Sequence, residues 1–206
     1  EGGCAMQRAY NAGALREWSG DGEPNSVPFR VASLGGGPGF ELVACRAFCE
    51  RHLPRAKLDF ISLDLAKEWR DCAEGLGLRF NTWDVNDGDG LLRAAGVPKI
   101  DLAIISYVLH HYMETEHCCE WMAARLRAGD VGAIMIISRF EDLSFHVNGL
   151  GARGVRTHKL LSQPKYASPH DACASYQLLP TAPPRAGISQ LLPTAPPRAG
   201  ISQLLP

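Results

Sequence analysis

The chain has 206 residues, of which 46% are apolar and 21% charged, as is typical of water-soluble globular proteins. Its formal net charge of −1 at pH 7 gives no general electrostatic reason for a nucleic-acid or membrane partner, although a local basic groove is compatible with it. The longest apolar run, Ala133–Ile137, is too short to cross a bilayer. These numbers favour one domain that buries its own core.

The seven cysteines are an odd number without framework-like spacing or a C-x-x-C motif, which predicts free thiols and an intracellular protein, cytoplasmic or nuclear. Cys45 and Cys49 are one helical turn apart and are expected to be packing residues. Because the chain opens with Glu1 rather than Met, it is interpreted as a fragment that lacks its true N-terminus.

The predicted elements begin with a helix over Ala5–Trp18 and a loop over Ser19–Pro28. The predicted strands are Phe29–Leu34, Leu58–Leu63, Leu78–Trp83, Ile100–Tyr107, Val131–Ser138 and, on a weaker pattern, Val155–Leu161. The predicted helices between them are Pro38–His52, Lys67–Gly75, Gly90–Ala95, Glu114–Leu126 and Phe140–Gly151. Strands that alternate with helices favour βαβ units, and hence an α/β fold with a doubly wound, mostly parallel sheet.

The C-terminal segment repeats a 13-residue unit, Q-L-L-P-T-A-P-P-R-A-G-I-S, from Gln177, and breaks off in a third copy at Pro206. Three prolines in each unit exclude a helix or a central strand, which predicts a disordered tail. The repeat either has a function or is a translated nucleotide repeat. The predicted organisation is an N-terminal helix and loop (1–28), a folded domain (29–161), and a linker with the repeat tail (162–206).

A glycine-rich turn, L-G-G-G-P-G-F, joins the first strand to the first helix of the domain. Glycines bring backbone N–H groups close to whatever lies over such a turn, and a helix N-terminus favours negative charge and hydrogen-bond acceptors. The dinucleotide fingerprint G-x-G-x-x-G is not present, because Phe40 stands where its last glycine belongs. This spacing disfavours a nicotinamide-dependent oxidoreductase.

Two acidic residues follow the next two strands: Asp64 in I-S-L-D-L and Asp84 in N-T-W-D-V. Open α/β sheets bind ligands at the carboxyl ends of their strands, so both carboxylates are expected beside the glycine turn. The first could accept both hydroxyls of a ribose and the second the exocyclic amine of an adenine. Alternatively, each is the N-cap of the following helix.

The turn G-x-G-x-G and the two acids, in this order over Phe29–Ser138, resemble the class I S-adenosylmethionine-dependent methyltransferases. The resemblance implies a Rossmann-like methyltransferase fold with S-adenosylmethionine as cofactor. It further implies that Asp64 binds the ribose and Asp84 the adenine amino group, with Leu65 and Val85 beside the adenine ring. The implied residues for the methionyl part and the methyl-transfer face are Gly35, Gly36, Gly37, Gly39 and Ser106, the last within I-D-L-A-I-I-S-Y-V-L-H-H.

The chain departs from the family pattern just before the glycine turn. Many family members carry an acid two residues before the first glycine, to hold the methionyl ammonium group, and this chain has Ser33 there. Glu41 is the candidate replacement. The family sheet has seven strands, the last antiparallel and beside the fifth. The final hairpin therefore either lies within Phe145–Tyr176 or is missing, which would leave the C-terminal strands incomplete.

The predicted function is a methyltransferase of unknown acceptor, an RNA or a small molecule. The segments L-G-G-G-P-G-F-E-L-V-A and L-D-L-A-K-E-W faintly resemble eukaryotic ribosomal-RNA uridine methyltransferases. His110 or His111 could act as a base, but no catalytic residue is identified. No metal is expected, because the adjacent pairs His110-His111 and Cys118-Cys119 point in different directions. The alternative is a non-catalytic methyltransferase-like subunit that acts through protein interaction.

Overall fold

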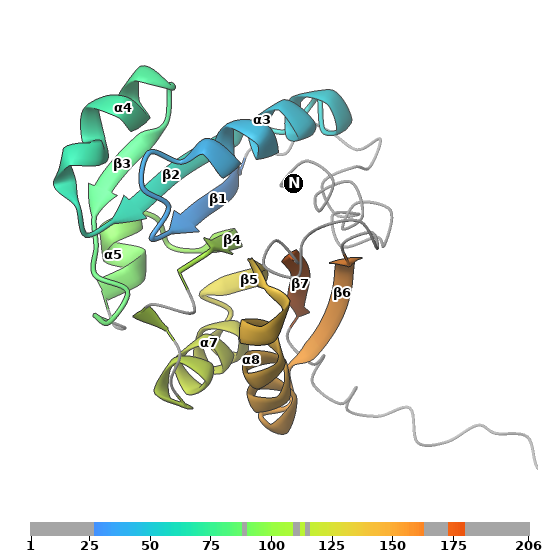
Figure 1. Cartoon of the computed structure of the whole chain (residues 1–206). Helices are drawn as coiled ribbons and strands as arrows, with labels where there is room; N and C mark the ends of the chain where they lie inside the picture. Colours follow the sequence, from blue (N-terminus) through green and yellow to red (C-terminus); the bar gives the residue numbers. More distant parts are fainter. Residues whose placement is uncertain (1–26, 88–89, 109–111, 114–115, 163–172, 180–206) are drawn as a thin grey trace, which may run out of the picture.

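The computed structural model describes residues 27–87, 90–108, 112–113, 116–162 and 173–179. The predicted helix over Ala5–Trp18 and the repeat beyond Leu179 lie outside these residues. The described part is a seven-stranded sheet in the order β3-β2-β1-β4-β5-β7-β6 (Figure 1). Its strands are β1 (Phe29–Leu34), β2 (Leu58–Asp64), β3 (Arg79–Thr82), β4 (Ile100–Ser106), β5 (Val131–Arg139), β6 (Arg156–Ser162) and β7 (Cys173–Leu179).

Strands β1 to β5 run parallel, and β7 is antiparallel to both β5 and β6. The helical elements are α3 (Phe40–His52), η1 (Lys67–Trp69), α4 (Arg70–Gly75), α5 (Leu91–Ala95), α7 (Glu116–Ala128) and α8 (Phe140–Ala152). The predicted doubly wound α/β fold is confirmed. The predicted helix over Lys67–Gly75 is divided into a 3₁₀ turn, η1, and the short helix α4.

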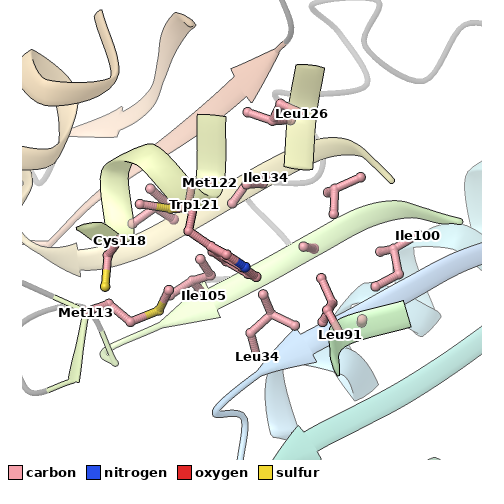
Figure 2. Packing of buried hydrophobic residues seen from close by; sticks show 14 of the residues in the cluster. Leu34, Leu91, Ile100, Ile105, Met113, Cys118, Trp121, Met122, Leu126 and Ile134 are labelled. Atoms are coloured by element: carbon pink, nitrogen blue, oxygen red, sulfur yellow. The ribbon is translucent and has the colours of Figure 1, made fainter. Parts of the chain in front are cut away.

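The sheet separates two hydrophobic clusters. One lies under α3 and α4, where Leu42 and Cys45 pack on Val31 and Ile104. The other lies under α5, α7 and α8. Figure 2 shows part of the second cluster, with Trp121 and Met122 of α7 over Leu34, Ile105 and Ile134 of the sheet. Apolar residues at successive strand positions, buried on both faces, are what a parallel sheet between two helix layers requires.

The last strand corrects the domain boundary. Strand β7 lies beyond residue 161, where the sequence pattern placed the end of the folded domain, and it includes the first three residues of the repeat. It pairs with β5 from Ile134↔Leu178 to Arg139↔Cys173, so the final hairpin is present. The described strand ends at Leu179.

Parallel register brings the carboxyl ends of β1 to β5 to one edge of the sheet. Leu34 pairs with Leu63, and Asp64 with Thr82. On the other side, Ser106 pairs with Ile137. The turns that follow β1, β2, β3 and β4 are therefore neighbours in space. Among the described helices, none is both long and apolar enough to span a membrane.

Candidate functional site

The glycine turn after β1 needs its glycines for backbone conformation and for space. Gly35, Gly37 and Gly39 have φ of 66°, 52° and 81°, in the left-handed region that side chains disfavour. A Cβ on Gly35 would lie 2.7 Å from Cγ2 of Val108. A Cβ on Gly39 would lie 2.7 Å from Cδ1 of Leu78. The absence of a side chain at Gly35 thus lets Val108, in the loop after β4, approach the glycine turn. The absence of one at Gly39 lets the start of α3 pack on Leu78.

Three N–H groups of this turn are bonded within the chain. The amide of Gly35 donates to the carbonyl of Leu63 at 2.7 Å, and that of Gly39 to the carbonyl of Gly36 at 2.9 Å. The amide of Gly37 donates to Oδ2 of Asp64 at 2.7 Å. The turn therefore differs from a phosphate-binding loop, whose amides point at the ligand.

Asp64 joins the turns after β1 and β2. Besides accepting the Gly37 amide through Oδ2, it accepts the Ala66 amide through Oδ1 at 2.8 Å. Each carboxylate oxygen has a second lone pair, so both retain acceptor capacity. The alternative that Asp64 is a helix N-cap is wrong, because η1 has Ala66 as its N-cap without a side-chain hydrogen bond.

Asp84 follows β3, and among the described residues its side chain bonds only to Asn86, two residues along the chain. Its Oδ1 accepts the amide of Asn86 at 2.8 Å and the side-chain Nδ2 of the same residue at 3.1 Å. The N-cap of α5 is Gly90, so the N-cap alternative is wrong here too. Before it, Trp83 is buried and donates its Nε1–H to the Asp87 carbonyl at 3.2 Å, which holds this turn closed.

The strand-end turns enclose a cavity of about 580 Å³. It is lined by Gly35, Asp64, Leu65, Ala66, Trp69, Trp83, Asp84, Val85, Asn86, Val108 and Tyr112. Two of these described residues are acidic and none is basic. The volume suits a drug-sized ligand. A pocket with carboxylates and no cation favours a ligand that carries positive charge and hydroxyl or amine donors.

The structure brings together five of the nine predicted cofactor residues: Gly35, Asp64, Leu65, Asp84 and Val85 line the cavity. The other four, Gly36, Gly37, Gly39 and Ser106, are not among its lining residues. Gly37 packs against Trp69, Gly39 begins α3, and Ser106 ends β4. The cavity residues that the motifs did not assign are Ala66, Trp69, Trp83, Asn86, Val108 and Tyr112. Three of them, Ala66, Trp83 and Asn86, lie within two residues of a predicted acid, a proximity that sequence alone could have used.

Ser33 and Glu41 meet beneath the glycine turn. The buried Ser33 hydroxyl donates to Oε1 of Glu41, on the first turn of α3. Burial raises the pKa of Glu41, and the negative charge of Asp64 raises it further, while the Ser33 hydrogen bond and the residue's own backbone amide oppose this. A carboxyl group therefore does reach the position of Ser33, from the helix rather than from the strand.

The loop after β4 forms the other wall of the site. Tyr107 has a φ of 58°, and its amide donates to the Ile137 carbonyl at 2.8 Å. At the far end of the loop, Nε2 of the buried His146 bonds to the Met113 carbonyl at 2.7 Å. Tyr112, between these two points, lines the cavity. The candidate bases His110 and His111 lie outside the described residues.

Two of the described cysteines, Cys45 and Cys49, belong to the core under α3. Cys45 and Cys49 are fully buried in the cluster under α3, which confirms them as packing residues. Their mutual hydrogen bond, together with burial, raises the pKa of Cys45 well above its ordinary value, so this thiol stays protonated. In the part of the chain that the structure describes, no group of three or more His, Cys, Asp or Glu side chains could hold a metal ion.

No protein-family model and no curated protein sequence matches the chain, but solved structures do. The CurJ carbon methyltransferase matches with a TM-score of 0.58 and 13% identity, over 87% of this chain and 54% of that one. The citrinin polyketide synthase CMeT domain matches at 0.60 and 12%, over 87% and 52%. The plantazolicin methyltransferase BpumL, in complex with SAH, matches at 0.51 and 12%, over 87% and 85%.

This chain spans about half the length of the first two of these structures. At sequence identities this low, the matches establish the fold but not the function. The described domain has the Rossmann-like fold of class I methyltransferases.

Proposed function

We propose that this protein is an S-adenosylmethionine-dependent methyltransferase. The observation that carries the proposal is the charge of the cavity at the carboxyl edge. Asp64 and Asp84 line it without a basic residue among the described lining, and the amides of Gly35, Gly37 and Gly39 are already bonded within the chain. This site disfavours the pyrophosphate of a dinucleotide and favours an adenosyl group that carries a cation.

The residues present fit such a cofactor. The remaining lone pairs of Asp64 can accept the ribose hydroxyls, and Asp84 can accept the adenine amine, with Leu65 and Val85 beside the ring. The methionyl part of the cofactor would follow the ribose and lie over the turn Gly35–Gly39, which includes Gly36 and Gly37. Ser106 is the last residue of β4, the strand beside β1. Glu41 brings beneath this turn the acid that family members carry at the position of Ser33.

When bound, the sulfonium supplies a methyl group already attached to a good leaving group, ready for in-line displacement. The work left to the chain is to bind, to orient and to exclude water. Val108, nearly buried, closes the cavity against Gly35, and Tyr112 lines the same side. These two residues are where an acceptor would meet the cofactor.

Calorimetry with S-adenosylhomocysteine and with NAD⁺ tests the proposal. We expect micromolar binding of S-adenosylhomocysteine and none of NAD⁺. Binding of NAD⁺ alone would indicate an oxidoreductase. Binding of neither ligand would support the alternative, a non-catalytic subunit that keeps the fold and acts through protein interaction.

The acceptor is a finer question. The faint resemblance to ribosomal-RNA uridine methyltransferases makes ribosomal RNA one class to test, with apolar small molecules as the other. The described cavity lining holds no Lys or Arg for phosphate groups, which favours the small molecules. Transfer of a radiolabelled methyl group to purified ribosomal RNA would reverse this preference.

A further inference from the structure

Trp69 is a large apolar side chain left open to solvent beside the cavity. It is the last residue of the 3₁₀ turn η1, is 43% exposed and lines the cavity. The other tryptophans that the structure describes, Trp83 and Trp121, are 3% and 8% exposed. Tryptophan has the largest apolar surface of any side chain, so an exposed indole at the mouth of a pocket has surface to offer a ligand.

The indole lies over the glycine turn. Its Nε1 is 3.5 Å, and its Cε2 3.6 Å, from the position of a Cβ on Gly37. Asp64 connects the turn that holds Trp69 to the glycine turn, because its carboxylate accepts hydrogen bonds from the amides of both Ala66 and Gly37. Trp69 is therefore positioned by hydrogen bonds on the neighbouring backbone, although its own ring is half exposed.

The sheet order indicates which part of a ligand the ring would meet. Asp84 and Val85 follow β3, Asp64 follows β2, and the glycine turn follows β1, in spatial order along the edge. With the adenine at Asp84 and the ribose at Asp64, the next part of the ligand, which carries the sulfonium, must lie over the glycine turn. Aromatic faces attract cations, and indole does so most strongly.

We propose that Trp69 is a ligand-contacting, specificity-determining residue that favours the charged sulfonium of S-adenosylmethionine over the neutral thioether of S-adenosylhomocysteine. The inference rests on the proposed function. Trp69 thereby distinguishes substrate from product, because its contact with the ligand weakens when transfer of the methyl group turns the charged sulfonium into a neutral thioether.

The test compares the two ligands by calorimetry on the wild type, Trp69→Leu and Trp69→Phe. We expect Trp69→Leu to lower the affinity for S-adenosylmethionine about tenfold and that for S-adenosylhomocysteine at most about threefold, because leucine covers the turn without an aromatic face. Trp69→Phe should retain most of the preference. Phe40→Leu is the matched control, since Phe40 is 65% exposed beside the same turn but does not line the cavity.

The outcomes separate the inference from the proposed function. Wild-type protein that binds neither ligand overturns both. Wild-type binding with an unchanged ratio of the two affinities in Trp69→Leu overturns the inference and leaves the function standing. Tryptophan emission gives a reading that does not depend on the leucine variant: ligand should change the emission of the wild type, and Trp69→Phe should reduce that change to the part contributed by Trp83, which also lines the cavity. The same change in Trp69→Phe would contradict the contact.

Discussion

The two halves of the sheet present different chemistry at the same edge. The half formed by β1, β2 and β3 ends in turns that are closed by hydrogen bonds, with Asp64 and Asp84 as acceptors. The half formed by β4 and β5 ends in a loop with aliphatic and aromatic side chains, where Tyr107 has a φ of 58°. At this edge the first half contributes both carboxylates of the cavity lining, and the second contributes Val108 and Tyr112.

The two halves also differ in the interactions that hold their turns in position. Asp64 uses charge-assisted hydrogen bonds to position two turns at once. The loop after β4 combines close packing of Val108 against Gly35 with the backbone bond from Tyr107 to Ile137 and the bond between His146 and Met113. The packing of Val108 on Gly35 leaves no room for an added methyl group.

Gly35→Ala should have the largest effect, because Gly35 is where the halves touch. The alanine would need a left-handed backbone and would press its Cβ into Val108, so we expect a loss of about 2–4 kcal/mol in the free energy of unfolding. Urea unfolding measures it. Gly75→Ala is the control: a Cβ there meets nothing within 4 Å, and stability should stay the same or rise by up to about 1 kcal/mol. Wild-type stability of Gly35→Ala would contradict the coupling of the halves.

The variants Asp64→Ala and Asp84→Ala compare what the two acidic residues of the first half contribute to stability and to ligand binding. Asp64 holds the distant Gly37 amide as well as a local one, so its loss should cost about 1.5–3 kcal/mol of stability and lower the affinity for S-adenosylhomocysteine about tenfold or more. Among the described residues the Asp84 side chain bonds only to Asn86, so its variant should lose affinity but less than about 0.5 kcal/mol of stability. Unchanged ligand binding in Asp64→Ala would remove Asp64 from the site.

Glu41→Gln tests the buried carboxyl group under the turn through its pH dependence. Burial raises the pKa of Glu41, so the folded state binds this proton more tightly than the unfolded state does. The wild type therefore loses stability as pH rises from the unfolded value of about 4.3 to the higher folded value, and stays at the lower level above it.

The glutamine variant has no such loss, so the difference in unfolding free energy should grow in its favour across that pH window. Glu50→Gln, at an exposed position of the same helix, is the matched control for the loss of one carboxylate from α3. A constant difference between wild type and Glu41→Gln at every pH would mean that Glu41 does not titrate in this way.

Tyr107→Gly should have the smallest effect, and it probes the second half alone. Glycine adopts a φ of 58° without the steric cost that other residues pay, so we expect stability to stay the same or rise by about 1 kcal/mol. Thermal unfolding measures it. Tyr107→Ala keeps a Cβ in the left-handed region and should not exceed the wild type. A glycine variant much less stable than the alanine variant would mean that the tyrosine backbone is not strained.

Much of the fold and part of the site can be predicted from the sequence. The strand Phe29–Leu34 has the same bounds in the structure, and the strands over Leu58–Asp64, Ile100–Ser106 and Val131–Arg139 end within one residue of their predicted bounds. Short apolar runs, glycines and helix stops are local patterns, which is why they suffice for elements. The carboxylates of Asp64 and Asp84 are predictable for the same reason, since each follows an apolar run directly.

The tertiary structure decides what depends on residues that are distant in the sequence. Strand β7 is recognisable only by its pairing with β5 and β6, because its sequence runs into a proline repeat. The contacts of Val108 with Gly35 and of Trp69 with Gly37 likewise follow from the order β2-β1-β4, not from any spacing along the chain. Local patterns specify which backbone forms, but long-range packing specifies which side chains share a cavity, and function depends on that sharing.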